Sequence, residues 1–353
     1  MFADHVDLAG LRHHGDVEAR PGLLDFAVNV QGSAPPAWLR ERLAGALDTL
    51  GRYPSHDDAR QAREAVARRH GVEADRVLTL AGGAEGFALL PRLRPRLAAV
   101  VHPSFTEPEL ALREADVAVT RVVLEPPYTL DPALVPAAAD LVVVGNPTNP
   151  TSVLHPAATL RALCRPGRIV VVDEAFMDAV PGEPESLAAE AGDGLLVLRS
   201  LTKTWALAGL RCGYLLGSPE VLRRLARGRA HWPLGTLQLT AVAATAEAAA
   251  VAGSQARAVE IGHERRAMAA RLSALGFEVA GPAAGPFLLL RVRDGEILRK
   301  QLRQQGIAVR RCDTFPGLGP DHLRVAVRPA AEVDRLVEVL RATGARHRIT
   351  DGT

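Results

Sequence analysis

Apolar runs without polar alternation recur through the first 200 residues, and they restrict the fold more than any other feature. The runs are RVLTLAG (76–82), LAAVVHP (97–103), DLVVVGNP (140–147), RIVVVDEAF (168–176) and GLLVLRSL (194–201). Strands that are buried on both faces of a parallel sheet have this character. Helical patterns lie between them, as at 58–71 and 157–167. The sequence therefore predicts an α/β domain with a mostly parallel sheet between helices.

The last third of the chain changes character. Short helical and strand patterns follow one another over 265–281, 285–292, 296–311, 321–329 and 330–343. An Ala-rich run, 240–252, precedes them and predicts a single buried helix. We expect an N-terminal segment (1–40) that joins a small α+β domain (241–353), and a large domain (41–240) between them.

Composition narrows the functional classes. The chain has 353 residues, of which 48% are hydrophobic and 23% charged, as in a globular protein with a sizeable core. The net charge is +2 without a basic run, so neither nucleic acid nor a membrane is an expected partner. Cys164, Cys212 and Cys312 lie far apart, which predicts no disulfide framework and no metal site. With no apolar membrane span and no signal-peptide pattern, a cytoplasmic location is expected.

Polar residues follow the predicted strands where each strand ends. They are the glycine turn AGGAEG (81–86), the loop GNPTNPTS (145–152), Asp173 and Lys203. Each has an ordinary interpretation, as a plain turn, a helix cap or a surface cation. However, ligands of open parallel sheets bind beyond the carboxyl ends of the strands, and all four groups fall at that edge.

One cofactor needs these four parts together. Pyridoxal phosphate binds a lysine amine covalently, and its ring nitrogen needs a carboxylate partner. Its phosphate needs an anion site such as a glycine turn, and its ring oxygen needs a hydrogen-bond donor. Lys203 is one of two lysines in a chain with 42 lysines and arginines, and arginine cannot take its place in such a bond.

The motifs NPTNPTS, VVDEAF and SLTKTWALAGLRCGY resemble those of fold-type I pyridoxal-phosphate enzymes, in the class I/II aminotransferase branch. The resemblance implies that Lys203 binds the cofactor covalently and moves protons, and that Asp173 pairs with the ring nitrogen. Asn149 would bond the ring oxygen and Phe105 would stack on the ring. The implied phosphate ligands are Gly83, Ala84, Ser200, Thr202 and Arg211. Tyr53 would reach the partner subunit's site, which implies a homodimer.

Within this branch the chain is similar to the histidinol-phosphate aminotransferases and the threonine-phosphate decarboxylases of cobalamin biosynthesis. Phe176, where the aminotransferases usually have tyrosine, resembles the decarboxylases, as do residues 309–328. The implied substrate contacts are His13, Asn29, Arg310 and Arg324, although the HH pair at 13–14 leaves open which histidine contacts the substrate. We therefore expect a threonine-phosphate decarboxylase, with a histidinol-phosphate type aminotransferase and a cofactor-binding regulator without turnover as alternatives.

Overall fold

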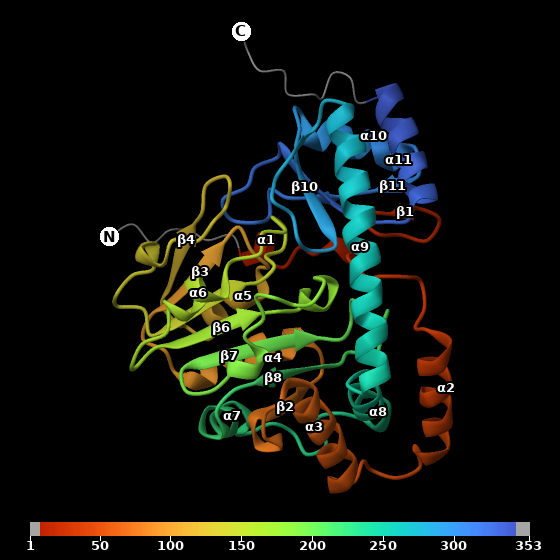
Figure 1. The fold of residues 1–353 in the computed structure, drawn as a ribbon. Helices are drawn as coiled ribbons and strands as arrows, with labels where there is room; N and C mark the ends of the chain where they lie inside the picture. Colours follow the sequence, from red (N-terminus) through yellow and green to blue (C-terminus); the bar gives the residue numbers. More distant parts are fainter. Residues whose placement is uncertain (1–7, 344–353) are drawn as a thin grey trace.

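The computed structural model describes residues 8–343 (Figure 1). Residues 1–7 of the predicted N-terminal segment and 344–353 of the predicted small domain lie outside the described residues. Within residues 8–343, the main sheet has seven strands. Their order is β2 (Val77–Leu80), β8 (Gly213–Leu216), β7 (Leu195–Ser200), β6 (Ile169–Asp173), β5 (Leu141–Gly145), β3 (Ala98–His102) and β4 (Val119–Val123).

The central strands are parallel and buried on both faces, as predicted. β3, β4, β5, β6 and β7 pair in parallel, whereas β8 runs antiparallel to both β7 and β2. Every residue of β3 and β7 is buried. The two antiparallel pairings give β2 the same direction as β7, so its carboxyl end lies at the same edge of the sheet.

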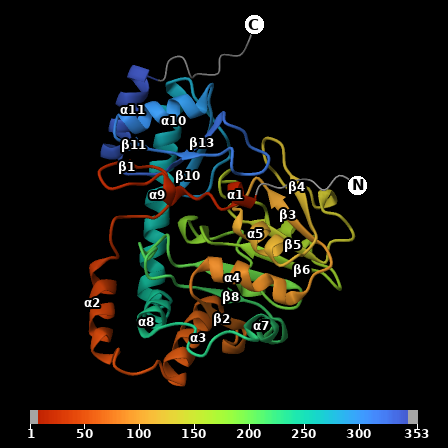
Figure 2. The same ribbon diagram turned by 180° about the vertical axis from the view of Figure 1, so that it is seen from behind.

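Helices cover both faces of the sheet (Figures 1 and 2). Helices α4 (Gly83–Leu89), α5 (Glu107–Glu114) and α7 (Pro219–Ala226) pack on one face, and α3 (His56–His70), α6 (Ala157–Arg161) and α8 (Thr236–Thr245) pack on the other. Helix α2 (Ala37–Ala46) packs against α8 through the core residue Leu39. The α/β prediction is thus confirmed, and the apolar runs correspond to buried strands.

A second layer of smaller elements lies beyond this sheet, at the blue end of the chain in Figure 1. Its antiparallel sheet has the order β12 (Arg310–Arg311), β13 (His322–Ala326), β10 (Phe287–Arg291) and β9 (Glu278–Val279). Helices α10 (Gly295–Gln304) and α11 (Ala330–Thr343) pack there. The long helix α9 (Ala248–Ala274) runs beside both layers. The exact domain boundaries stay predictions.

The N-terminal segment lies against this second layer. It contains α1 (Leu8–Leu11) and β1 (Leu24–Asp25), which pairs in parallel with β11 (Ile307–Ala308). Phe26 is fully buried among residues of α9, β10 and α11. Residues 24–26 therefore share a core with the last third of the chain.

The Ala-rich run differs from the prediction, because it forms two helices instead of one. Helix α8 ends at Thr245, and α9 begins at Ala248 after Glu247, whose backbone is extended. The Thr245 hydroxyl donates to the Ala241 carbonyl at 2.7 Å. Such a bond competes with the helical ladder and favours a bend or an end. The prediction of a single helix over 240–252 is wrong.

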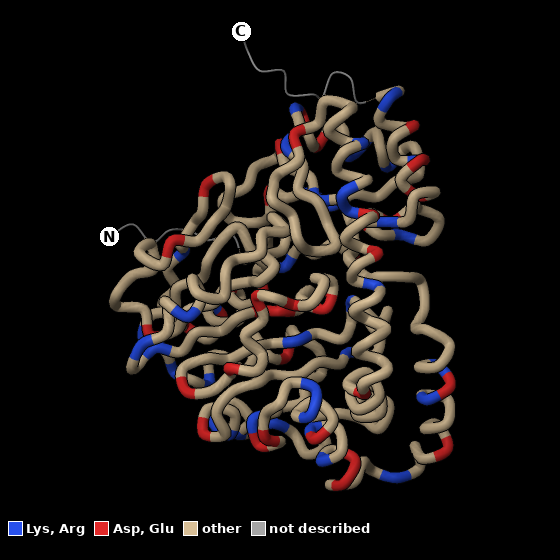
Figure 3. Tube along the Cα trace, in the orientation of Figure 1, with Lys and Arg blue, Asp and Glu red and all other residues tan. Residues whose placement is uncertain are grey.

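Charges are dispersed over the surface of the described residues. Lysines and arginines are interspersed with aspartates and glutamates along the whole trace instead of gathering in one region (Figure 3). Among residues 8–343, no helix combines the length and the apolar character that crossing a bilayer requires.

Candidate active site

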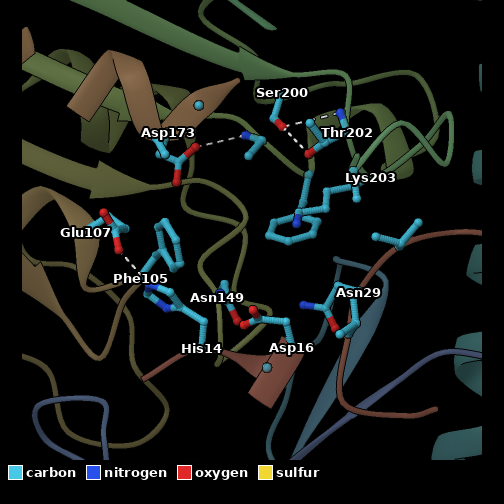
Figure 4. Close-up of a pocket in the computed structure, with 18 of the residues that line it drawn as sticks. His14, Asp16, Asn29, Phe105, Glu107, Asn149, Asp173, Ser200, Thr202 and Lys203 are labelled. Carbon is cyan, nitrogen blue, oxygen red and sulfur yellow. Dashed lines mark hydrogen bonds and ion pairs between the residues drawn. The ribbon is translucent and has the colours of Figure 1, made fainter. Parts of the chain in front are cut away.

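A cavity of about 450 Å³ lies at the carboxyl ends of the main-sheet strands (Figure 4). The N-terminal segment and the second layer complete its walls. The predicted site residues that line it are Asn29, Gly83, Ala84, Phe105, Asn149, Asp173, Ser200, Thr202, Lys203, Arg211, Arg310 and Arg324. The strand-end groups read from the sequence thus meet in one place, as the topology of a parallel sheet requires.

Asp173 ends β6 between Gly145 of β5 and Leu198 of β7. Its Oδ1 accepts a hydrogen bond from the Ala175 N–H at 3.1 Å. Burial, with a smaller contribution from the neighbouring Glu174 charge, raises the pKa of Asp173 to about 7. A buried carboxylate with only a backbone donor is poorly compensated, so a positively charged N–H donor in the cavity would stabilise its ionised form.

Lys203 lies in the loop that follows β7, and its side chain enters the cavity (Figure 4). Burial, followed by the charges of Arg324 and Arg211, lowers the pKa of the Lys203 amine to about 8. About one amine in ten is then neutral at pH 7, against fewer than about one in a thousand for an exposed lysine. The neutral amine is the nucleophilic form, so Lys203 is prepared to react with an aldehyde.

The glycine turn lies beside Arg211 and two hydroxyl groups. Gly82 has a φ of 83°, and a Cβ added to it would come within 2.8 Å of Arg211 Nη2. The Ser200 and Thr202 hydroxyls are 2.7 Å apart. Hydroxyls, a guanidinium and the backbone N–H groups of a glycine turn are the groups that bind phosphate in proteins. The positive φ of Gly82 is a conformation that L side chains rarely adopt, which favours glycine at this turn.

Phe105 and Asn149 form the opposite side of the cavity (Figure 4). Phe105 follows β3 and packs against Phe87, with ring centroids 6.0 Å apart, and against His14 at 5.2 Å. Asn149 Oδ1 accepts from Arg324 Nη1 at 2.5 Å. This bond fixes the amide, so its N–H₂ group is left to donate to a ligand.

Arg310 and Arg324 lie side by side on β12 and β13. Their side chains are 2% and 5% exposed. Burial, with the Arg310 charge as the next cause, lowers the pKa of Arg324 to about 9, and burial also lowers the pKa of Arg310. Arg324 Nε is buried without a hydrogen-bond partner among the described residues. Two buried cations whose hydrogen bonds go mainly to carbonyls form a site for an anionic group.

Two predicted contacts do not line the cavity. His13 Nε2 lies 3.4 Å from Glu18, whereas His14 lines the cavity and its Nε2 lies 2.5 Å from Glu107 Oε1. Tyr53 is 72% exposed and stacks on Trp232, with centroids 4.2 Å apart. Its predicted role therefore requires a second copy of the chain.

Three polar lining residues were not singled out from the sequence as single site residues. They are His14, Asp16 and Glu107. His14 was left open as an alternative to His13. Their side chains are near one another in Figure 4. The motifs HHGD and FTEPE contain them, but only the docking of the N-terminal segment on α5 brings the two motifs together.

Phe176 forms part of the cavity wall and is 7% exposed. Its ring packs edge-on against Phe287, with centroids 4.9 Å apart and an interplanar angle of 77°. The side chain offers no hydrogen-bond donor to a ligand, as the sequence indicates.

A parallel-sheet fold with a lysine, a buried aspartate and a phosphate-type turn defines a class of cofactor-dependent enzyme, and comparison with known proteins agrees. Residues 22–340 match the family of class I and II aminotransferases, and the chain belongs to that family. It is 58% identical over 326 residues to a histidinol-phosphate aminotransferase of Mycobacterium bovis, covering 92% of this chain and 89% of the relative.

Two further relatives show the breadth of the family. The chain is 32% identical over 332 residues to a threonine-phosphate decarboxylase of Salmonella typhimurium, covering 90% of each. The crystal structure of a histidinol-phosphate aminotransferase from Clostridium acetobutylicum superposes with a TM-score of 0.83 at 22% identity, over 91% of this chain and 98% of that one. The predicted fold type and family are thereby confirmed.

Members of this family depend on pyridoxal phosphate, and the residues present fit that cofactor. The part-neutral amine of Lys203 suits its aldehyde, and the poorly compensated carboxylate of Asp173 suits its ring nitrogen. The Gly82–Arg211 contact and the Ser200–Thr202 hydroxyls suit its phosphate. The prediction of a decarboxylase, by contrast, stays a prediction, since the 58% relative bears the name of the alternative.

Proposed function

We propose that this protein is a pyridoxal-phosphate-dependent aminotransferase that acts on a phosphorylated amine, with L-histidinol phosphate as its first candidate substrate. The pair of buried guanidiniums, Arg310 and Arg324, carries the proposal, because it offers an anion site in the same cavity as Lys203. The 58% identity to the M. bovis aminotransferase supports the choice of substrate.

We assign the cofactor contacts as the sequence motifs imply. Lys203 holds the cofactor and moves protons through Nζ, Asp173 pairs with the ring nitrogen, Asn149 donates to the ring oxygen and Phe105 packs on the ring. Gly83, Ala84, Ser200, Thr202 and Arg211 bind the phosphate. When bound, pyridoxal phosphate supplies an aldehyde that takes up the substrate amine and a ring that withdraws electrons from it.

The substrate lies at the other end of the cavity in this proposal. Arg310 and Arg324 bind its phosphate, or the carboxylate of an amino-group acceptor such as 2-oxoglutarate. Asn29 is 4% exposed and its Oδ1 has no partner among the described residues, so it is available to a ligand. Of the two histidines left open by the HH pair, we assign the substrate contact to His14, because its ring lies at the cavity wall.

A second candidate is the decarboxylase that the sequence favoured. The observation in its favour is Phe176, which cannot donate a hydrogen bond into the cavity where the aminotransferases usually carry tyrosine. The 32% identity to the Salmonella decarboxylase is its further support. L-threonine O-3-phosphate is the substrate to test for this alternative.

We further propose that the working unit is a homodimer in the cytoplasm. The large apolar side chains Trp38, Leu47, Leu50, Tyr53 and Trp232 are exposed on and beside α2, and exposed apolar groups of this kind mark interaction sites. Three free cysteines fit a reducing compartment.

The test is to give the cofactor-loaded protein each substrate separately. With L-histidinol phosphate and 2-oxoglutarate, we expect glutamate and the corresponding ketone phosphate without release of CO₂. With L-threonine O-3-phosphate, release of CO₂ with formation of aminopropanol phosphate would instead establish the decarboxylase. Absence of both reactions would refute both substrates.

A further inference from the structure

Residues Asp25–Gln31, here called the wall segment, connect the second layer to the loop of Lys203. The segment leaves the small parallel pair β1–β11, and Ala27–Val30 line the cavity. At its far end the Gln31 N–H donates to the Lys203 carbonyl at 2.9 Å. Its backbone position therefore sets where the Asn29 side chain lies relative to Lys203.

Arg328 holds this segment by its backbone. Arg328 Nε donates to the Asp25 carbonyl at 2.8 Å, and Nη2 and Nη1 donate to the Val28 and Val30 carbonyls at 2.6 and 3.0 Å. Arg324 donates to the carbonyl between them, that of Ala27. One planar guanidinium thus binds three carbonyls of an irregular segment, which its rigid fork of five N–H donors permits and a lysine ammonium does not.

The Arg328 guanidinium is directed mainly to these carbonyls and not to a carboxylate. Its closest acidic group is Glu332, one helical turn on, at 3.9 Å. Burial lowers the pKa of Arg328, and the charges of Asp25, Glu332 and Glu264 oppose that effect. A largely buried cation that bonds mainly carbonyl oxygens is poorly compensated for its lost hydration.

The wall segment has a second, weaker support that would survive without Arg328. Asp25 Oδ1 accepts from the N–H groups of Ala27 and Val28 at 2.7 and 3.0 Å, which closes a local turn. The Phe26 backbone is bonded to Ala308 and Ala326. Loss of Arg328 therefore releases the Val28 and Val30 carbonyls, while the start of the segment stays in place.

We propose that Arg328 is a positioning residue, which fixes the wall segment so that Asn29 contacts the substrate. Asn29 points toward Asn149 and Asp16 across the cavity (Figure 4), and its buried Oδ1 has no protein partner in the described part of the chain. The inference rests on the proposed function, since it needs the cavity to bind the substrate. The proposed role of Arg328 differs from that of Arg324, because Arg324 lines the cavity and Arg328 does not.

The test compares Arg328→Gln and Arg328→Lys with the wild-type holoenzyme in transfer of the amine from L-histidinol phosphate to 2-oxoglutarate. For Arg328→Gln we expect the KM to rise about tenfold or more, with kcat within about threefold. Arg328→Lys is expected to be intermediate, because it keeps the charge but not the fork. Affinity for the cofactor, titrated by absorbance, is expected to stay unchanged, because no Arg328 contact reaches Asp173 or the glycine turn. Arg335→Gln is the matched control, since Arg335 lies exposed on α11 and, among residues 8–343, pairs with Glu338.

A double-mutant cycle distinguishes positioning from general stability. If Arg328 acts through Asn29, Arg328→Gln adds little to the KM of Asn29→Ala, whereas a general loss of stability adds in full. Hydrogen exchange of the holoenzyme is the readout that needs no substrate. We expect faster exchange at the Gln31 amide, whose N–H donates to the Lys203 carbonyl, but not in α11. If Arg328→Gln does not fold, Arg328→Lys carries the same comparisons.

An unchanged KM in folded Arg328→Gln, fully additive effects with Asn29→Ala, or unchanged exchange at the Gln31 amide would each overturn the inference. Failure of the wild-type protein to transfer the amine would instead refute the proposed function, and hydrogen exchange would still decide whether Arg328 holds the wall segment.

Discussion

Replacing Lys203 by methionine should stabilise the cofactor-free protein near neutral pH. The cavity lowers the pKa of the Lys203 amine from 10.5 to about 8, first by burial and then by the charges of Arg324 and Arg211. A reactive lysine is thus held in surroundings that disfavour its charged form. Methionine has a similar length and carries no charge, so it removes that penalty.

The size and the pH window of the effect follow from the two pKa values. Since the folded-state pKa lies below the unfolded one, the unfolded chain binds more protons between about pH 8 and about pH 10.5, and the wild-type unfolding free energy gains from rising pH there. The shift corresponds to about 3 kcal/mol. The unfolding free energy of Lys203→Met minus that of the wild type should therefore be about 3 kcal/mol larger below about pH 8 than above about pH 10.5.

Urea unfolding of the cofactor-free proteins across this pH range measures the difference. Lys300→Met is the matched control, because Lys300, the other lysine of the chain, is exposed on α10 and lies 3.5 Å from Glu296. Its difference from the wild type should stay within about 0.5 kcal/mol. A stability difference for Lys203→Met that does not change with pH would refute the reasoning about the amine.

Three further predictions test other parts of the site. Asp173→Asn should fold normally, since burial already raises the pKa of Asp173 to about 7. Its affinity for pyridoxal phosphate should fall at least about tenfold in an absorbance titration. Equal affinity would argue against the ring-nitrogen contact. Arg199→Leu removes a fully buried guanidinium that forms ion pairs with Glu174 at 2.9 Å and Asp178 at 2.7 Å. The unfolding free energy in urea should therefore fall by about 3–5 kcal/mol, and a loss below about 1 kcal/mol would contradict this. Tyr53→Ala should weaken self-association in sedimentation experiments, and an unchanged association constant would remove Tyr53 from the proposed interface.

The buried strands were readable from the sequence because a parallel strand covered on both faces must be apolar throughout. β2, β3, β5, β6 and β7 all fall within the runs identified. β4 and β8 were not predicted. β4 is an edge strand interrupted by Arg121. β8 begins at Gly213, in a stretch whose sequence was interpreted as part of a cofactor motif and not as a strand.

The strand-end part of the site was predictable for the same topological reason. Asp173 ends β6 and Lys203 closely follows β7, so the fold alone brings them together. The Glu107–His14 pair and the Arg328 contacts were not predictable. They arise where the N-terminal segment docks on two elements distant in sequence, and no local pattern encodes such docking.

The most direct test of the account is whether pyridoxal phosphate is bound to Lys203. Borohydride treatment of the holoenzyme, followed by digestion and mass spectrometry, fixes and locates the covalent bond. We expect the cofactor's mass on the peptide that contains Lys203, and no cofactor-bearing peptide from Lys203→Ala. The cofactor's mass on the Lys300 peptide, or on any peptide from Lys203→Ala, would contradict the account.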